Sequence, residues 1–224
     1  MAQAQKTNWF AIWISVGVVA ALVLVGALVV WMNNSANAPG PRPAGAGINS
    51  ETGAIEVGSG SNELDIWFDF YCPHCQDFER EYGSTVDDLL EQGDLQVNLF
   101  PVALASLNAA SGTDFSKRSA NALYCVAEAE PDAAYPFMQA IFATDPTGPG
   151  LTDEELIAAA SDAGATGIDA CVTDREYVDF VDAQTREIPE NPETGGQGTP
   201  TVVLNGDFIQ LTGDPEADLV ARLG

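Results

Sequence analysis

Two cysteines separated by two residues, Cys72 and Cys75, are the clearest chemical signal in the sequence. Pro73 suits the first position of a helix, where a backbone N–H would have no partner, so Cys72 is predicted to be the N-cap. Its sulfur would then face free N–H groups and the positive end of the helix dipole, which both favour a thiolate. His74, the only histidine in the chain, lies between the cysteines, and its imidazole is expected to lower the pKa of Cys72 further.

The expected chemistry is exchange between thiols and disulfides. A stabilised thiolate is a good leaving group, so a disulfide between Cys72 and Cys75 should be easily reduced and should oxidise other thiols. In the expected cycle, a substrate thiolate attacks Cys72, Cys75 leaves, and a second substrate thiolate breaks the mixed disulfide. Cys72 is thus the predicted exchange residue and Cys75 its more buried partner. No metal or other cofactor is expected beyond the redox-active disulfide itself.

Two other roles for a C-x-x-C motif are open from the residues alone. The motif can form half of a zinc site, but zinc needs two further ligands, and Cys125 and Cys171 are each isolated and 46 residues apart. The motif can also be a purely structural disulfide, but so short a loop constrains the unfolded chain little. Redox exchange is therefore the favoured interpretation.

The residues around the motif predict a strand, a helix and a second strand. Residues 63–70 mix alternation with apolar bulk, which is typical of a central strand. From residue 73 to about 92, apolar side chains recur at helical spacing, and Gly93 is expected to end that helix. Residues 95–102 form the next predicted strand, and residues 54–57 a short one. Strand, helix and strand in this order indicate parallel pairing.

The rest of the chain predicts a helical block followed by a hairpin and a last helix. Asn205-Gly206 lies between two short β-like runs, 201–204 and 207–211, and is typical of a type I′ turn. Helical patterns cover residues 116–130, 135–143, 152–163, 169–188 and 214–223. This order is typical of an α/β thioredoxin fold with an inserted α-helical subdomain, here at about residues 105–190.

Thr199-Pro200 is the second signal, because it opens a strand after the flexible Gly/Pro-rich loop 189–198. A trans bond is the ordinary expectation for such a pair. In a thioredoxin fold, however, a loop at this point faces the C-x-x-C motif, and a cis-proline there exposes backbone groups to an incoming peptide. Thr199 could then pair with substrate backbone like an added strand.

Three features carry a resemblance to a known family. The run from Phe68 to Cys75 (FDFYCPHC), the helical insert, and Gly198-Thr199-Pro200-Thr201 resemble the DsbA-type thiol–disulfide oxidases, most of all the membrane-anchored forms of Gram-positive, actinobacterial type. The resemblance covers roughly residues 48–224. It implies a thioredoxin fold, oxidation of exported proteins, a cis peptide at Thr199–Pro200, and reoxidation by a quinone-linked membrane partner of the DsbB or vitamin-K-epoxide-reductase type. A Cys-Pro-His-Cys centre is specific to the oxidising members, since reducing members commonly have Gly-Pro between the cysteines.

One departure from the family pattern concerns a buried carboxylate. Many thioredoxin-fold proteins place it six residues before the first cysteine, where this chain has Ile66. By strand alternation, the neighbouring Asp65 points to the other face of the sheet. Proton transfer to and from Cys75 must then use water or another group, for which Asp69 is the candidate.

The second pair of cysteines, Cys125 and Cys171, lies in the helical insert. In an oxidising compartment two remaining cysteines usually pair, so a structural disulfide is predicted. It would close a loop of 47 residues and contribute about 4 kcal/mol by the chain-entropy model. The alternatives are two separate buried thiols or a second redox-active pair.

An uncharged apolar stretch at residues 9–32 predicts a transmembrane anchor. At about 1.5 Å per residue it spans roughly 36 Å, enough to cross a bilayer with some tilt, and Trp9, Trp13 and Trp31 lie near its ends. Lys6 precedes it, which predicts a cytoplasmic segment 1–8 and an exported remainder. A cleaved signal peptide ending at Ala36-Asn37-Ala38 is the alternative. Residues 33–47 are predicted to be a linker, and residues 48–224 the catalytic domain.

The net negative charge of the chain excludes some classes of binding partner. The chain has a formal net charge of −25, and all 33 acidic residues lie at or after Glu51. So acidic a surface repels phosphates, so nucleic-acid binding and peripheral membrane binding are not expected. The leading function is a monomeric extracytoplasmic dithiol oxidase of reduced exported proteins. The alternatives are a reductase or isomerase of the same fold, and a non-catalytic peptide-binding chaperone.

Overall fold

The computed structural model describes residues 9–36 and 40–224, which form parts of two compact units divided after Ala38. The predicted cytoplasmic segment 1–8 and residues 37–39, which include most of the possible cleavage site, lie outside the described residues. Each unit is described by itself below.

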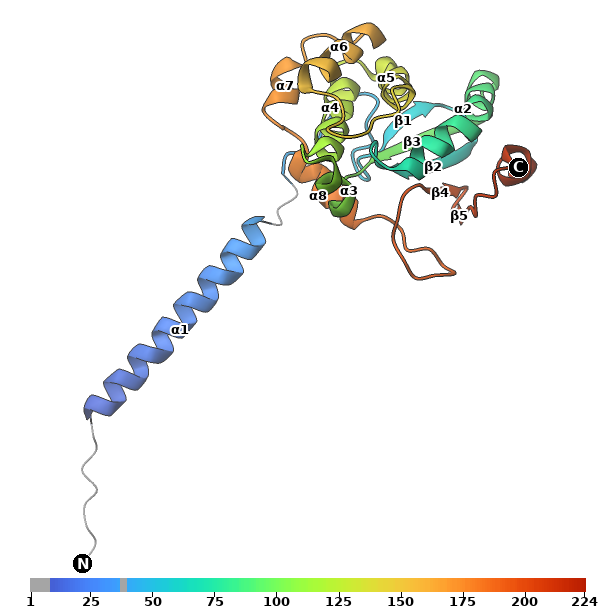
Figure 1. The fold of residues 1–224 in the computed structure, drawn as a ribbon. Coiled ribbons are helices and arrows are strands. Elements are labelled where there is room, and N and C mark those ends of the chain that lie inside the picture. The colour runs from blue at the N-terminus through green and yellow to red at the C-terminus, as the bar shows by residue number, and fades with distance from the viewer. Residues whose placement is uncertain (1–8, 37–39) are drawn as a thin grey trace, which may run out of the picture. The chain divides into compact units, whose positions relative to one another are not determined.

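The first unit contains one helix, α1 (Trp9–Ala36) (Figure 1). Its large apolar side chains are exposed, and Trp9, Trp13 and Trp31 each expose 66% of their surface. The segment Ile12–Asn34 is long and apolar enough to cross a membrane, and none of it is buried in the protein. The helix continues four residues past the predicted end of the span, so the start of the predicted linker is helical.

The second unit begins earlier than the sequence predicts, because residues 40–47 of the predicted linker pack against it. Arg42 donates hydrogen bonds to the carbonyl oxygens of Ser50 (2.8 Å) and Glu51 (2.7 Å). Its guanidinium also lies 5.4 Å from the centre of the Phe180 ring. Pro43 is buried, and the boundary of the folded unit therefore lies near residue 40 rather than at residue 48.

A five-stranded sheet forms the centre of this unit, in the order β1-β3-β2-β4-β5. The strands β2 and β3 are parallel, as the sequence predicts, and all other neighbours are antiparallel. The strands are β1 (Ile55–Gly58), β2 (Asn62–Phe68), β3 (Leu95–Pro101), β4 (Thr201–Leu204) and β5 (Asp207–Phe208). The predicted turn at Asn205-Gly206 joins the last two.

The two faces of β2 pack against different hydrophobic clusters. Leu64, Ile66 and Phe68 are buried in the main core. Trp67 belongs to a smaller cluster, where its ring stacks on Phe100 at 4.3 Å between centroids. Strand alternation thus puts Asp65 on the face opposite to Ile66, as expected.

The helix α2 (Pro73–Gln92) connects β2 to β3 and covers the core face of the sheet. It ends as predicted at Gly93, whose φ of 75° is left-handed and favours glycine. The insert between β3 and β4 consists of α3 (Ala105–Ser111), α4 (Phe115–Ala129), α5 (Pro131–Ala143), α6 (Asp153–Ala163), α7 (Asp169–Thr173) and α8 (Val178–Arg186). The chain closes with α9 (Pro215–Asp218) and the 3₁₀ turn Val220–Arg222.

The predicted single helix 169–188 is wrong, because the structure divides it into α7 and α8. Arg175 between them has a φ of 60°, which a continuous helix does not allow. The N–H of Tyr177 bonds the side-chain oxygen of Asn121 on α4 at 2.7 Å. A tertiary hydrogen bond thus replaces a helical one at this position. The last predicted helix is also shorter, since α9 has four residues.

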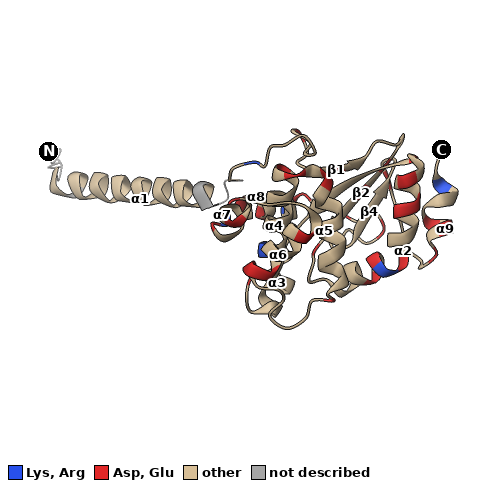
Figure 2. Ribbon diagram, turned by 90° about the horizontal axis from the view of Figure 1, so that it is seen from above, with Lys and Arg blue, Asp and Glu red and all other residues tan. Residues whose placement is uncertain are grey.

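Acidic residues lie on most elements of the second unit, as the red parts of the ribbon in Figure 2 show. Several Lys and Arg side chains are already paired with carboxylates, such as Lys117 with Asp182 at 2.7 Å. Arg118 and Arg175 both bind Asp153 at the start of α6. The positive charges therefore mostly hold the insert together and leave the surface acidic.

Candidate active site

Cys72 and Cys75 lie at the start of α2, where the sequence places them. Cys72 is the N-cap, with an extended backbone (φ −78°, ψ 118°), and Pro73 occupies the first turn. The N–H groups of Cys75 and Gln76 both bond the Cys72 carbonyl oxygen, at 3.0 and 3.1 Å. Both cysteines are free thiols, and they expose 4% and 1% of their surface.

The surroundings make the two sulfurs unequal. The pKa of Cys72 is lowered to about 5, chiefly by a hydrogen bond from the Cys75 thiol, against burial, which opposes the charge. Thr199 and the backbone N–H groups of Cys75 and His74 stabilise the thiolate further. Burial raises the pKa of Cys75 well above its usual value, and Cys72 raises it further. At neutral pH Cys72 is therefore the thiolate and Cys75 the thiol.

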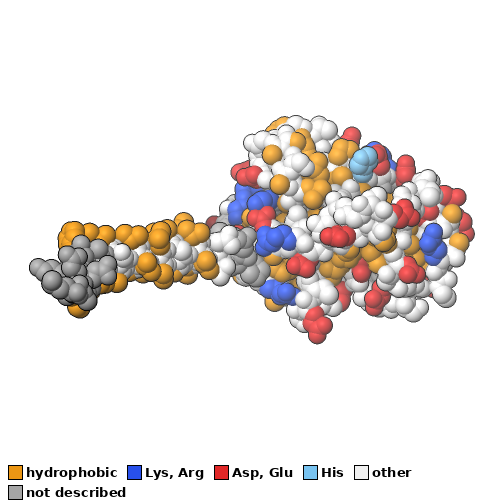
Figure 3. Space-filling model, turned by 90° about the horizontal axis from the view of Figure 1, so that it is seen from below, with side chains coloured by type: hydrophobic (Ala, Val, Ile, Leu, Met, Phe, Trp, Pro, Cys, Tyr) orange, Lys and Arg blue, Asp and Glu red, His pale blue; other side chains and the backbone are white. Residues whose placement is uncertain are grey.

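The geometry of the described residues gives no support to the expected role of the His74 imidazole, which stays a prediction. The side chain is 82% exposed (the histidine in Figure 3), and its nearest charged partner is Asp77 at 3.9 Å. The backbone N–H of His74 helps to lower the pKa of Cys72, after the larger contributions of Cys75 and Thr199. The physical reason is the start of the helix: its free N–H groups point back at the N-cap, whereas the side chain of this residue extends into solvent.

Replacing His74 with alanine should therefore change the pKa of Cys72 only slightly. The backbone N–H that stabilises the thiolate remains in the variant, and an exposed imidazole interacts weakly through water. The measurement is the ultraviolet absorbance of the thiolate against pH for the wild type and His74→Ala. A rise of the Cys72 pKa by more than about one unit would show that the ring acts directly.

Thr199 and Pro200 meet the cysteines across the fold. The peptide bond between them is cis. The Cys72 sulfur lies 3.3 Å from the carbonyl oxygen of Thr199, to which it donates in its thiol form, although the residues are 127 positions apart. The Thr199 hydroxyl is buried without a hydrogen-bond partner, and Thr199 lowers the pKa of both cysteines.

A groove of about 360 Å³ lies beside the cysteines, next to Thr199 and Pro200. It has an apolar floor and an acidic rim, formed by His74, Asp77, Phe78, Glu81, Tyr82, Asn191, Thr199, Pro200, Phe208, Ile209, Gln210, Leu211 and Gly213. A second hollow of about 240 Å³ shares Asn191, Thr199, Pro200 and Phe208 with it. An extended chain lying over Pro200 would contact both. Helical spacing identifies Phe78 as apolar but cannot show that its ring borders a groove.

Two buried acids lie near the cysteines. Asp69 has no exposed surface, and burial raises its pKa to about 6. Glu79, which sequence reasoning missed, is half-buried on α2, and burial and Asp87 raise its pKa to about 7. Ile66 is buried as expected, so the family's usual carboxylate position is apolar.

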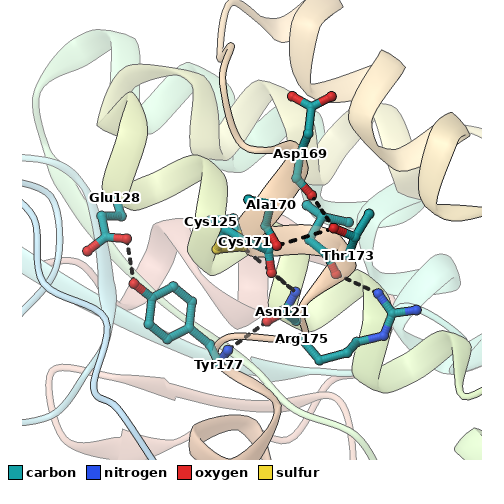
Figure 4. Close-up of a disulfide and its surroundings, with 10 residues drawn as sticks. Asn121, Cys125, Glu128, Asp169, Ala170, Cys171, Thr173, Arg175 and Tyr177 are labelled. Atoms are coloured by element: carbon teal, nitrogen blue, oxygen red, sulfur yellow. Dashed lines mark hydrogen bonds between the residues drawn. A yellow bond between two sulfur atoms is a disulfide. The ribbon is translucent and has the colours of Figure 1, made fainter.

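The insert contains a disulfide between Cys125 on α4 and Cys171 on α7, the pair expected from the sequence. The Cα atoms are 5.9 Å apart, within the ordinary range. Asn121 lies beside the bridge (Figure 4) and donates to the Cys171 carbonyl oxygen at 3.3 Å. Its side-chain oxygen accepts the Tyr177 N–H, so one buried amide fixes both sides of the break between α7 and α8.

The chain is similar to a known family and to several solved structures. A family model described as thioredoxin matches residues 58–218. Oxidised DsbA from Mycobacterium tuberculosis is 31% identical, with a TM-score of 0.66 over 76% of this chain and 90% of that one. The reduced disulfide bond oxidoreductase DsbG of the same organism is 29% identical, with a TM-score of 0.66 over 76% and 85%. MdbA, a thiol-disulfide oxidoreductase from Actinomyces oris, is 23% identical, with a TM-score of 0.61 over 80% and 90%. No curated protein matches the chain.

Proposed function

Because the chain belongs to the thioredoxin family and is a DsbA-like thiol–disulfide oxidoreductase, we propose that it works as an oxidase that donates the Cys72–Cys75 disulfide to exported proteins. The observation that carries the direction is the lowered pKa of Cys72, about 5, beside a buried Cys75 whose pKa is raised. A dithiol held in this way is most stable when reduced, so its disulfide is readily given away.

The proposed cycle uses only the two sulfurs and the substrate. A substrate thiolate attacks the Cys72 sulfur, the Cys72–Cys75 bond breaks, and Cys75 leaves and takes a proton. A second substrate thiolate attacks its own sulfur in the mixed disulfide, a substrate disulfide forms, and Cys72 leaves as a thiolate. Two electrons have passed from the substrate to the protein. The hydrogen bonds from Cys75, Thr199 and the first turn of α2 stabilise that leaving thiolate.

The size of this effect follows from linkage. Lowering the pKa of Cys72 from 9 to about 5 favours the reduced protein by up to about 100-fold at pH 7, or roughly 60 mV. The sign is that of a depressed pKa: the advantage is absent below about pH 5 and grows until about pH 9. The disulfide should therefore become a stronger oxidant, relative to an unperturbed dithiol, as pH rises through this window.

The equilibrium constant of the full chain with glutathione, measured in detergent at pH 7, tests the direction. The expected reduction potential is near that of a strong oxidant, roughly −120 mV. Thiols counted by mass spectrometry would assign the change to Cys72 and Cys75. A value near roughly −270 mV, as in thioredoxin, would contradict the oxidase and favour the alternative, a reductase or isomerase.

Substrate binding is proposed at the groove beside the cysteines. The apolar floor suits side chains of an unfolded segment, and the Thr199 backbone would pair with an extended peptide like an added strand. The acidic rim at Asp77 and Glu81 favours neutral or basic segments over acidic ones. The same features would also suit a non-catalytic chaperone. The variant Cys72→Ser distinguishes the two functions, because an oxidase loses its activity in it and a chaperone does not.

The location is proposed to be the outer side of a membrane. The exposed apolar helix α1 supports a single-pass anchor or signal sequence, and we favour an uncleaved anchor with the N-terminus in the cytoplasm. Disulfide chemistry is typical of extracytoplasmic compartments. The reduced protein then needs an oxidant, for which a quinone-linked membrane protein of the DsbB or vitamin-K-epoxide-reductase type is the proposed partner.

A further inference from the structure

One buried carboxyl group next to the cysteines has no part in the cycle above. Asp69 follows the end of β2, three residues before Cys72, and has no exposed surface. Its main chain contacts both cysteines. The carbonyl oxygen accepts the N–H of Cys72 at 3.0 Å, and its N–H stabilises the Cys75 thiolate. The residue is therefore part of the turn that carries the dithiol.

Three neutral groups from different elements hold the carboxylate. The N–H of Tyr71 donates to one oxygen and the N–H of Leu104, just before α3, donates to the other, each at 2.9 Å. The hydroxyl of Ser116 on α4, which is buried without a hydrogen-bond partner, also lowers the pKa of Asp69. None of these groups is a Lys or Arg, so the negative charge of Asp69 is buried without a cation against it.

The charged group that faces Asp69 is the Cys72 thiolate, which has the same sign. Burial is the main reason that the pKa of Asp69 is raised to about 6, and the Cys72 charge raises it further. Two like charges in a buried site each make the other harder to form. The thiolate exists only when the dithiol is reduced. Reduction should therefore favour the neutral form of Asp69, and oxidation its carboxylate.

We propose that Asp69 takes up a proton when the Cys72–Cys75 disulfide is reduced and releases it when the disulfide forms again. The proton that Asp69 takes up comes from the substrate thiols. Two substrate thiols lose two electrons and two protons as they become a disulfide. One proton goes to Cys75 and Cys72 keeps its negative charge. The second proton is shared between Asp69 and water, and the share that Asp69 takes is largest near pH 6, where its carboxyl group titrates. Asp69 is then a positioning residue that acts on the dithiol through charge.

Glu79 is the competing buried acid and serves as the matched control. It borders a small apolar cavity together with Ile66 and Cys75. Its carboxyl group, however, lies against Gly83, one turn further along α2, and its charge interacts with Asp87 and Gln139. The charge of Glu79 thus interacts with Asp87 and Gln139, whereas the charge of Asp69 interacts with Cys72.

The test is the glutathione equilibrium constant of the full chain in detergent against pH, for the wild type, Asp69→Asn and Glu79→Gln. In Asp69→Asn no carboxylate repels the Cys72 thiolate, so the reduced form is more stable. The equilibrium constant of this variant at pH 7 should therefore be that of a stronger oxidant, by roughly three- to tenfold. Below about pH 5 the wild-type group is neutral, and the two constants should converge. The Glu79→Gln ratio should not change with pH. A pH-independent ratio for Asp69→Asn, or a bend that appears only for Glu79→Gln, would overturn the proposal.

In Asp69→Asn the amide NH₂ group would face one of the two N–H donors, and this could unfold the site. A second measurement therefore uses the wild-type protein without any substitution. The carbon-13 signal of the Asp69 carboxyl group can be titrated in the oxidised and the reduced wild-type protein. The pKa should be higher in the reduced protein, and equal values in both would refute the coupling. The Asp69 proposal can fail without the oxidase proposal. The size of the glutathione equilibrium constant at pH 7 decides between oxidase and reductase, whereas only the change of that constant with pH concerns Asp69.

Discussion

Replacing Cys72 with serine will abolish oxidation of reduced substrate proteins, to the background rate of the buffer. A serine oxygen cannot form the mixed disulfide, and Cys75 is too deeply buried (1% exposed) to replace it. The measurement is the refolding of a reduced, disulfide-containing substrate by oxidised full-length protein. Persistent activity in Cys72→Ser would contradict the assignment of the exchange residue. Retained protection of substrates from aggregation, without oxidation, would favour the chaperone alternative.

Two variants at Cys75 complete this experiment. Cys75→Ser should accumulate mixed disulfides with oxidised substrates, because the Cys72 thiolate can still attack a substrate disulfide but no second protein thiol is left to break the bond that forms. Serine can donate a hydrogen bond to the Cys72 sulfur, as the Cys75 thiol does, whereas alanine cannot. The pKa of Cys72 should therefore be higher in Cys75→Ala than in Cys75→Ser. Equal values would show that the hydrogen bond from position 75 is not the main cause of the lowered pKa.

Removing the disulfide of the insert should cost about 4 kcal/mol of stability, because its loop spans 47 residues. The variant is Cys125→Ala with Cys171→Ala, and its urea unfolding can be followed by near-ultraviolet circular dichroism of the full chain in detergent. The main structural reason is that the bridge holds α7 against α4, where otherwise the Asn121 contacts alone would fix the break before α8.

The same double variant separates a structural bridge from a redox-active one. Cys72 and Cys75 are unchanged in it, so its equilibrium constant with glutathione should equal that of the wild type. A loss of stability with an unchanged constant supports the structural role. A large change in the constant, with stability retained, would instead indicate a second redox pair.

Local patterns in the sequence predict much of the fold, because they coincide with local causes. Pro73 and Gly93 mark both ends of α2, and alternation in β2 separates Ile66 from Asp65. Thr152 is an N-cap with acidic residues after it, and the structure shows the full capping box with Glu155. Each of these features depends on residues within one turn or one strand.

What the sequence does not predict depends on distant contacts. The break at Arg175 accompanies a hydrogen bond from Tyr177 to Asn121, and these two residues are 56 positions apart in the chain. The docking of residues 40–47 depends on Arg42 and Phe180, which only the fold brings together. The orientation of His74 follows from its place in the first turn, which spacing between the cysteines does not reveal. The groove residues come from α2, β5 and two loops, so no local pattern identifies them.

The bridge between α4 and α7 has a consequence for how the protein is made. Each new copy begins with four thiols, which can pair in three ways. The structure has one of these pairs as a bridge and leaves Cys72 and Cys75 free to exchange. Under the proposed function, a newly exported chain is itself a substrate for copies that have already matured. The supply of mature protein would then grow autocatalytically, with the first molecules depending on another oxidant.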